Sequence, residues 1–412
     1  MAGKIAIFTK ADLILTLAGA ARQGGRRVKE ADLGFLEKAS MVCRDGRLEW
    51  IGPHRRLPKQ YARARHREVE LKGSTVLPGL VECHTHLVFA GDRAAEFEQR
   101  NQGVSYQEIA ARGGGILSTM KRTRAASTAE LARLAQHRAD VFAEQGVTTL
   151  EVKSGYALNL KDELRQLEAA GRLKGPRVRR TFLAAHALPP EFKTYEEYLE
   201  FLGREVLPAV KRKKLAERVD IFVEKGFFPA EASRRYLEKA KALGFQTLIH
   251  ADQLSLSGGT RLAVELGSLS ADHVIQVGEG EIRALAASET TAVLLPSADL
   301  YMKCAYPPAR QMIDAGVRVA LATDFNPGTS PSQDVNLVGL LARLEMKMTL
   351  PEVISAYTVG AAHALGRAQE IGSLEVGKCA DFVNTTADWR TLFYSVGERS
   401  YQGVYCQGSL IN

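Results

Sequence analysis

The sequence predicts an α/β protein: a (β/α)8 barrel of the TIM type with a small β-sandwich domain built from both ends of the chain. Residues 78–371 alternate short apolar strands with helical segments, the pattern of repeated β/α units. Residues 1–77 and 372–412 show strand and turn patterns without that alternation. Histidines recur at the expected carboxyl ends of the barrel strands, which form one rim in this fold.

Length and composition fit this division. The chain has 412 residues, of which 45% are hydrophobic and 25% charged, as in ordinary globular proteins, and it is too long for one small core. No apolar run reaches the roughly 18 residues of a membrane-spanning helix, and the first residues lack the apolar core of a signal peptide. Five scattered cysteines without a Cys-x-x-Cys pair favour a reducing cytoplasm over a disulfide framework.

The net charge of +8 raises the question of a nucleic-acid partner. The basic residues are dispersed, however. The densest run, Lys211–Lys214, ends a predicted helix and has no interleaved aromatic residues. We interpret it as a solvated helix terminus and expect neither nucleic acid nor a membrane as partner. A mildly positive field would suit a small anionic substrate.

The terminal segments are expected to pair in one small sandwich. Asp45-Gly46 is a hairpin signal between two strand patterns. The expected strands are Lys4–Leu17, Ala39–Cys43, Arg47–Ile51 and Arg67–Leu71 at the start of the chain, and Gly372–Gly377, Ala380–Val383 and Val404–Ile411 at its end.

The barrel region is expected to contain eight β/α units. The first full helix begins at a capping box, Ser127-Thr-Ala-Glu130, and Gly146 ends it. The expected strands are Val81–His86, Val147–Val152, Val178–Ala184, Val219–Val223, Gln246–Ile249, Leu269–Val274, Ala292–Leu295 and Val317–Ala322. The later helices are expected at Leu160–Leu173, Tyr195–Val210, Ala230–Leu243, Gly259–Leu266, Glu279–Ala287, Ala309–Ala315 and within Asp334–Leu365.

An open, doubly wound sheet is the alternative fold. It would need a glycine-rich phosphate loop after the first strand, where Cys83-His-Thr-His86 stands instead. His84 and His86 are two residues apart in a strand-like run, so both imidazoles leave the same face. Such a pair supplies half of a zinc or iron site.

The other histidines divide into two groups. Four lie away from strand ends and are interpreted as surface or helix-packing residues: His54, His66, His137 and His363. Three others end further strands of the barrel: His186, His250 and His273. Asp324 ends the eighth strand, so all four residues are expected to meet His84 and His86 at one rim.

Strands one and eight are neighbours in a closed barrel. We therefore predict a metal site of His84, His86, His250 and Asp324, with a position left for water. A zinc or iron ion there would lower the pKa of bound water to about 7 and generate an attacking hydroxide. Asp324 is placed to accept the water's proton and deliver it to a leaving nitrogen, while His273 is placed to orient the water or stabilise the attacked oxygen.

At these residues the sequence resembles the amidohydrolase superfamily and, within it, the imidazolonepropionase family. The resemblance extends almost from end to end. Its most specific blocks are His84-Thr-His-Leu-Val-Phe-Ala-Gly-Asp-Arg93, Gly113-Gly-Gly-Ile116, Glu151-Val-Lys-Ser-Gly-Tyr156, His250-Ala-Asp-Gln253, Ser270-Ala-Asp-His273 and Ala322-Thr-Asp-Phe-Asn-Pro-Gly-Thr-Ser-Pro331.

The resemblance implies hydrolysis of 4-imidazolone-5-propanoate to N-formimidoyl-L-glutamate in histidine degradation, by a cytoplasmic enzyme expected to be a homodimer. It implies one zinc or iron ion on the four predicted ligands. It also implies substrate contacts at Arg93, Tyr156, His186 and Gln253, with Asn326, Gly328 and Thr329 on the product side. A guanidinium can hold the substrate's propionate through two hydrogen bonds, which suits Arg93.

Three points stay open. Gln253 stands where many deaminases of the superfamily carry glutamate, and an amide cannot transfer a proton, so cleavage at a ring carbonyl is favoured. Glu224 and Lys225 lie near the position where members with two metals carry a bridging ligand. Gly113-Gly-Gly115 is either a closing loop or a plain turn.

Three other functions compete with this interpretation: another cyclic amidase or heterocycle deaminase of the superfamily, a metal-binding barrel without catalysis, and nucleic-acid binding. The set of Arg93, Tyr156 and His186 around an open coordination position argues against a barrel without catalysis. Only the net charge favours nucleic acid.

Overall fold

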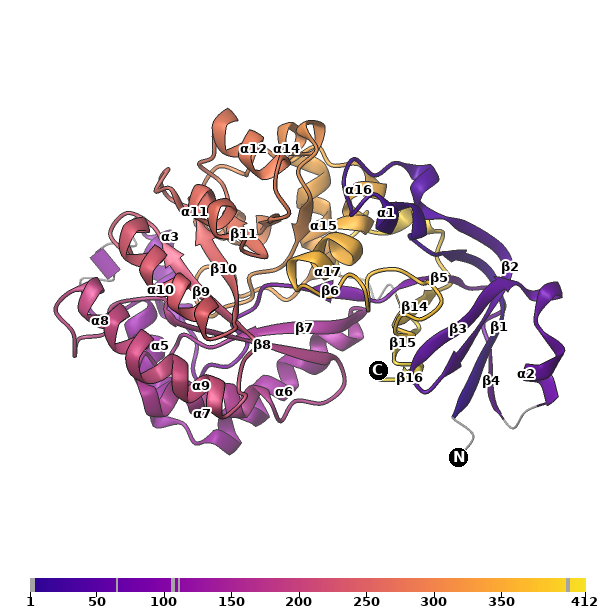
Figure 1. Ribbon diagram of the computed structural model, residues 1–412, viewed down its shortest axis with the longest axis horizontal. Coiled ribbons are helices and arrows are strands. Elements are labelled where there is room, and N and C mark those ends of the chain that lie inside the picture. The colour runs from indigo at the N-terminus through magenta and orange to yellow at the C-terminus, as the bar shows by residue number, and fades with distance from the viewer. Residues whose placement is uncertain (1–3, 64–65, 105–107, 110–111, 398–400) are drawn as a thin grey trace.

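The computed structural model describes residues 4–63, 66–104, 108–109, 112–397 and 401–412. Within these residues, eight parallel strands form a sheet in the order β13-β12-β11-β10-β9-β8-β7-β6, and helices surround it (Figure 1). The fold-class prediction is confirmed. The strands are β6 (Leu80–Glu82), β7 (Val147–Lys153), β8 (Arg177–Ala185), β9 (Arg218–Val223), β10 (Gln246–Ala251), β11 (Ser270–His273), β12 (Thr291–Leu294) and β13 (Val319–Leu321).

The barrel closes between its first and last strands just beyond β6. Thr85 forms a parallel bridge with Phe325, and the His86 N–H donates to the Phe325 carbonyl at 2.9 Å. The predicted first strand, Val81–His86, is therefore too long, because regular pairing ends at Glu82. The extended chain continues to the bridge, so the two-residue alternation that unites His84 and His86 is kept.

Helices follow the strands as the alternation predicts. The Ser127 hydroxyl accepts from the Glu130 N–H at 3.1 Å, which confirms that helix start. Sequence reasoning missed three helices, at Ala94–Asn101, Ile116–Ala125 and Pro296–Met302. The helices of this region are α3 (Ala94–Asn101), α5 (Ile116–Ala125), α6 (Thr128–Glu144), α7 (Leu160–Ala170), α8 (Tyr195–Phe201), η3 (Leu202–Val206), α9 (Leu207–Arg212), α10 (Ala230–Ala242), α11 (Gly259–Leu266), α12 (Glu279–Ala286), α13 (Pro296–Met302), α14 (Ala309–Ala315), α15 (Val335–Leu344), α16 (Leu350–Ser355), η4 (Ala356–Gly360) and α17 (Ala361–Ala364).

Strands from both ends of the chain form the second sheet. β1 pairs with β4 along its first half and with β5 along its second, so the sheet branches around an apolar core that includes Phe8, Phe382 and Tyr405. The strands are β1 (Ile5–Leu15), β2 (Phe35–Arg44), β3 (Arg47–Pro53), β4 (His66–Glu70), β5 (Thr75–Pro78), β14 (Phe382–Thr385), β15 (Gly403–Cys406) and β16 (Ser409–Leu410). Short helices join them: α1 (Ala18–Arg22), η1 (Glu30–Leu33), η2 (His54–Arg56), α2 (Lys59–Arg63) and η5 (Trp389–Thr391).

One predicted strand of this sheet is wrong. Residues 372–377 form bends and a turn. Gly372 and Gly377 have φ angles of 91° and 92°, which interrupt an extended run at both ends. Its backbone hydrogen bonds go to two different segments instead of one partner strand. The Leu374 N–H donates to the Thr16 carbonyl, and the Gly377 N–H donates to the Leu48 carbonyl.

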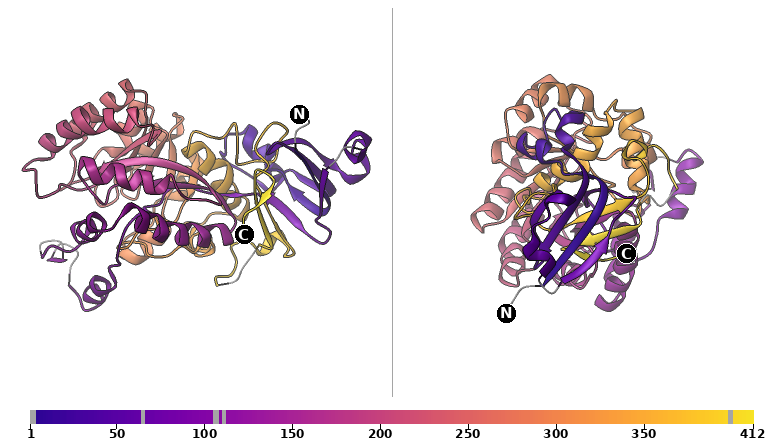
Figure 2. Two further views of the ribbon diagram at one scale, coloured as in Figure 1. Left: turned by 90° about the horizontal axis from the view of Figure 1, so that it is seen from below. Right: turned by 90° about the vertical axis from the view of Figure 1, so that its right-hand side faces the viewer.

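The terminal sheet lies beside one end of the barrel (Figure 2). Arg177 begins β8, and its guanidinium contacts the Asp381 carboxylate at 2.6 Å next to β14. The Gly79 N–H donates to the Asp381 carbonyl at 3.0 Å just before β6. Both contacts occur where barrel strands begin, so the sheet leaves the opposite rim open. In the described part of the chain, no helix is long and apolar enough to cross a membrane.

Candidate functional site

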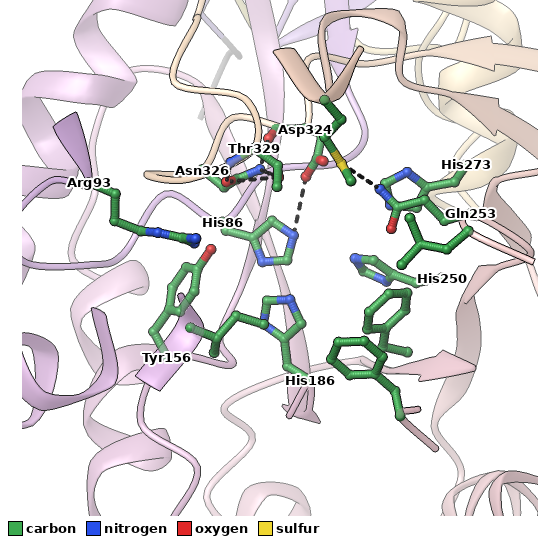
Figure 3. A pocket seen from close by; sticks show the side chains of 15 residues that line it. His86, Arg93, Tyr156, His186, His250, Gln253, His273, Asp324, Asn326 and Thr329 are labelled. Atoms are coloured by element: carbon green, nitrogen blue, oxygen red, sulfur yellow. Dashed lines mark hydrogen bonds and ion pairs between the residues drawn. The ribbon is translucent and has the colours of Figure 1, made fainter. Parts of the chain in front are cut away.

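The predicted histidines and the aspartate meet at the rim formed by the carboxyl ends of the strands. Figure 3 shows His86, His186, His250, His273 and Asp324 around the cavity. His84 and His86 follow β6, and Asp324 follows β13. The other three are at the ends of their strands: His186 directly follows β8, while His250 lies in β10 and His273 ends β11. All six side chains are buried.

Backbone strain accompanies this rim. Asp252, His273 and Asp324 have φ angles of 50°, 76° and 51°, in the left-handed region that residues other than glycine rarely adopt. Each lies where the chain leaves a strand. Strained backbone of this kind is concentrated at functional sites, where the surrounding packing enforces it.

Two sets of side chains have the spacing of a metal site. In the first, ligand atoms of His84, His86 and His250 lie within 4.8 Å of one another, and in the second those of His84, His273 and Asp324 do. Asp324 Oδ1 lies 3.4 Å from Nε2 of both His84 and His86. Buried atoms here lack a hydrogen-bond partner among the described residues, which fits an unsatisfied coordination set: His84 Nε2, His250 Nε2 and Asp324 Oδ1.

The electrostatic setting favours neutral imidazoles at His84, His86 and His273. At His250, burial opposes the charged form, but the Asp220 carboxylate outweighs burial and raises the pKa. Burial lowers the pKa of His84 and His86 well below its ordinary value, and it lowers the pKa of His273 to about 3. Burial raises the pKa of Asp324, against the opposing influence of His273. A neutral imidazole has a lone pair for a metal, so these residues fit the ion that the resemblance implies.

Sequence reasoning assigned no role to four charged residues next to the histidines, which we call the inner charge cluster: Glu151, Lys153, Asp220 and Asp272. Their side chains are fully buried. The Lys153 Nζ lies 3.0 Å from Glu151, 2.8 Å from Asp220 and 3.6 Å from Asp272. The sequence did contain a signal for them, since charged residues lie inside three otherwise apolar strands. Buried charges need partners, so such residues are expected to contact one another.

The charges of the inner charge cluster interact strongly. Burial opposes the charge on Lys153, but the three carboxylates outweigh it and raise the pKa of the ammonium. Asp220 and Asp272, with His250, form a third group with metal-ligand spacing. The Lys153 ammonium contacts both of those carboxylates, so a cation is already built into this group.

A cavity of about 390 Å³ opens above the histidines. Ten of the predicted site residues line it: His86, Arg93, Tyr156, His186, His250, Gln253, His273, Asp324, Asn326 and Thr329. His84 and Gly328 are not among the residues that line it. Five apolar side chains that the sequence did not single out complete the lining: Ile116, Phe222, Phe227, Leu254 and Met302.

Arg93 approaches the cavity from the loop before α3, and its guanidinium points toward the Tyr156 ring in Figure 3. Its Nε donates to Glu96 at 2.7 Å. The Glu96 carboxylate also accepts from the Gly115 N–H and the Ser118 hydroxyl. Glu96 therefore joins Arg93 to Gly115, the last glycine of the segment interpreted as a closing loop or a turn.

His186 has a fixed orientation. Its Nδ1 lies 3.1 Å from the Gly155 carbonyl, an acceptor, so Nδ1 carries the proton and Nε2 keeps a lone pair. Gly155 has a φ of 111°, and a Cβ there would lie 2.6 Å from the Leu183 carbonyl. Glycine is required for this close approach.

Two predicted substrate residues have structural partners. The Asn326 amide donates to the Asp324 carbonyl at 2.7 Å and accepts from the Gly328 and Thr329 N–H groups, so it braces the loop that presents Asp324. Gln253 donates to the Met302 sulfur at 3.5 Å. Neither contact removes these residues from the cavity wall.

Glu224 does not join the histidines. Its carboxylate accepts from the Leu254 and Ser255 N–H groups and the Ser255 hydroxyl, which fixes the loop after β10. Within the described residues, the groups with metal-ligand spacing do not include Glu224. The structure therefore gives no support to a second metal at Glu224 and Lys225.

Comparisons with known proteins agree with this architecture. The model of the amidohydrolase family matches residues 75–411. The imidazolonepropionase of Bdellovibrio bacteriovorus is 65% identical over 399 residues, which cover 97% of this chain and 94% of that protein. The imidazolonepropionase of Geobacillus kaustophilus is 44% identical over 380 residues, which cover 91% of this chain and 90% of that protein.

Solved structures share the fold at low identity. A triazine hydrolase variant matches with a TM-score of 0.72 at 16% identity, covering 99% of this chain and 94% of that chain. An adenosine deaminase from Xanthomonas campestris with bound zinc matches with a TM-score of 0.68 at 19% identity, covering 98% of this chain and 92% of that chain. Family model, relatives and fold agree, so the chain belongs to the amidohydrolase family and, within it, groups with the imidazolonepropionases.

Proposed function

We propose that this chain hydrolyses the cyclic amide bond of 4-imidazolone-5-propanoate to give N-formimidoyl-L-glutamate in histidine degradation. One observation of the structure carries the proposal. Candidate metal ligands and a guanidinium, Arg93, line the same cavity of about 390 Å³. That arrangement matches a substrate with a reactive ring and a carboxylate. The names of the two relatives support the same activity.

His84, His86, His250 and Asp324 would hold one zinc or iron ion. Three imidazole nitrogens and one carboxylate oxygen suit either metal. When bound, the ion would supply a hydroxide at neutral pH and polarise the ring carbonyl. The buried, unpartnered ligand atoms of this set support the assignment, as does the bound zinc of the adenosine deaminase that shares the fold.

The remaining polar residues would bind and orient the substrate. Arg93 would hold the propionate through two charge-assisted hydrogen bonds. Tyr156 and His186 would contact the polar edge of the ring, and Phe222 and Phe227 would pack against its faces. Gln253, Asn326, Gly328 and Thr329 complete the proposed binding surface.

Asp324 would move the proton. It would accept a proton from the attacking water as a new C–O bond forms at the ring carbonyl. It would then deliver that proton to the ring nitrogen as the C–N bond breaks. His273, neutral at pH 7, would donate a hydrogen bond to the attacked oxygen.

The alternative is another activity of the superfamily, a different cyclic amidase or a heterocycle deaminase. Gln253 argues against a deaminase that needs a glutamate at this position, because an amide does not transfer protons. The homodimer and the cytoplasmic location implied by the family resemblance belong to the same proposal, and sedimentation velocity would test the dimer.

The decisive experiment follows the absorbance of freshly prepared imidazolone propionate with zinc- or iron-loaded protein. We expect decay well above the spontaneous rate and formation of N-formimidoyl-glutamate. No acceleration by protein with bound metal would contradict the proposal, and release of ammonia from an aminated heterocycle would favour the deaminase.

Replacing Asp324 by Asn tests the proton-transfer role. The side chain keeps its shape but loses its basic oxygen, so we expect kcat to fall by about 10²–10⁴-fold with an unchanged circular-dichroism spectrum. Metal content is measured in parallel, because the substitution also removes a proposed ligand. A metal-loaded variant with wild-type kcat would overturn this role.

A further inference from the structure

The inner charge cluster, defined above, lies on three strands of the barrel. Glu151 and Lys153 are two residues apart in β7, so both side chains face the interior. Asp220 lies in β9 and Asp272 in β11. Lys153 is the only cation of this cluster, and it lies within 3.6 Å of all three carboxylates.

Two carboxylate oxygens each contact both Lys153 and a histidine. Asp272 Oδ2 lies 3.6 Å from the Lys153 Nζ and 2.7 Å from Nδ1 of His84. Asp220 Oδ2 lies 2.8 Å from the Lys153 Nζ and 3.0 Å from Nδ1 of His250. The ammonium is therefore linked to two imidazoles through two separate carboxylates.

These contacts decide which ring nitrogen faces the rim. A carboxylate accepts from an imidazole Nδ1–H, which leaves Nε2 as the lone pair. Nδ1 of His84 is within hydrogen-bond distance of Asp272 at 2.7 Å, whereas Nδ1 of His250 has an ion-pair contact with Asp220 at 3.0 Å and no partner of hydrogen-bond geometry. In both rings, Nε2 is buried and lacks a hydrogen-bond partner among the described residues. The carboxylates thus hold two rings with their free nitrogens directed at the same site.

We propose that Lys153 is a positioning residue that fixes two of the metal ligands, His84 and His250, at once by holding Asp272 and Asp220 in place. The inference rests on the proposed metal site. Without the ammonium, two buried carboxylates would repel each other and lose the partner that sets their orientation. Both histidines would then lose their fixed direction.

The chain offers a matched control. Arg218 is also a fully buried cation beside Glu151, at 4.0 Å, and it contacts Thr181 and the Leu365 carbonyl. Replacing Lys153 or Arg218 by Met removes one buried positive charge from the same barrel interior. A purely structural role predicts similar behaviour for both variants, whereas a positioning role separates them.

The test measures Zn²⁺ binding by competition with a chromophoric chelator, on protein whose near-ultraviolet circular dichroism shows a folded core. Loss of one supporting partner of a metal ligand typically lowers metal affinity about 10–100-fold. We expect at least that loss in Lys153→Met, and less than about 3-fold change in Arg218→Met. Equal affinities in wild type and Lys153→Met would overturn the inference. A Co²⁺-loaded sample should also show altered ligand-field bands in Lys153→Met alone.

If Lys153→Met does not fold, Asp272→Asn and Asp220→Asn test the same two links between Lys153 and the histidines. Each keeps the shape of the side chain and removes one of the two links, so each should lower Zn²⁺ affinity about 10-fold. Unchanged affinity in both folded variants would refute the linkage. Failure of the wild-type protein itself to bind Zn²⁺ or iron would instead contradict the proposed metal site, which keeps the two failures distinct.

Discussion

At the scale of single residues, the position of Arg93 depends on the absence of a side chain at residue 328. A Cβ on Gly328 would lie 2.0 Å from Nη1 of Arg93 and 2.3 Å from its Cζ. The backbone of Gly328 does not have a positive φ, so alanine fits the local conformation. Steric conflict with the guanidinium is therefore the main effect of a methyl group here.

Gly328→Ala should weaken substrate binding. The guanidinium must move away from its present place, so we expect KM for imidazolone propionate to rise about 10-fold, equal to about 1.4 kcal/mol, with kcat within about 2-fold of wild type. Steady-state kinetics separates the two constants. A change confined to kcat would show that residue 328 acts on the reacting centre rather than on the proposed anchor.

The identity of the metal-site candidates was also predictable at this scale. A strand has a period of two and a defined carboxyl end, so His84, His86 and Asp324 could be assigned to one rim from the sequence. The residues that contact them could not be predicted from the sequence. Asp272 meets His84 across 188 positions of chain, and that contact depends on how the strands close into a barrel.

At the scale of elements, η3 and η4 are π-helical turns within the described part of the chain, and each includes a glycine. η4 packs against β13, the strand that leads to Asp324. A Cβ on Gly360 of η4 would lie 2.1 Å from the Val319 carbonyl oxygen, which is backbone and cannot swing aside. A Cβ on Gly203 of η3 would approach the flexible end of Lys239 at 3.1 Å.

Gly360→Ala and Gly203→Ala form a matched pair. The first should lower the free energy of unfolding by about 1–3 kcal/mol, because the helix must move off the strand. The second should be neutral or stabilising by up to about 1 kcal/mol, because alanine favours helix and the lysine can shift. Urea denaturation measures both. Equal destabilisation would show that π-helical geometry, rather than contact with β13, requires glycine.

Element boundaries were predicted well where propensity and burial agreed. Gly259–Leu266 and Ala309–Ala315 match α11 and α14 at both ends. The strand predicted at Gly372–Gly377 failed, because its two glycines turn the chain and its backbone bonds reach two different segments. Local sequence does not contain those distant partners.

At the scale of the whole molecule, pH acts on a half-buried histidine away from the rim. His363 lies in α17, and burial together with the nearby Arg318 guanidinium lowers its pKa to about 4. The unfolded chain binds this proton near pH 6.5. Neutral His363 therefore supports the fold fully above pH 6.5, and this contribution is lost as pH falls from 6.5 toward 4.

His363→Asn should flatten the loss of stability in that window. The pKa difference sets an upper limit of about 3 kcal/mol on the contribution that disappears. Chemical denaturation of wild type and variant between pH 7.5 and pH 4 gives the two slopes. His137→Asn, at an exposed histidine of α6, is the control and should follow wild type. Parallel curves for wild type and His363→Asn would contradict the assignment.

The sequence by itself determined the order of the eight β/α units, the split of the second sheet between the chain ends, and the histidines and aspartate of one rim. These follow from periodicity and from the position of residues along single strands, which are local properties. Only the tertiary structure decided that Lys153 links Asp220 and Asp272 to two histidines, and that Glu224 braces a loop. Those contacts join strands far apart in the chain, so they depend on the register and closure of the barrel.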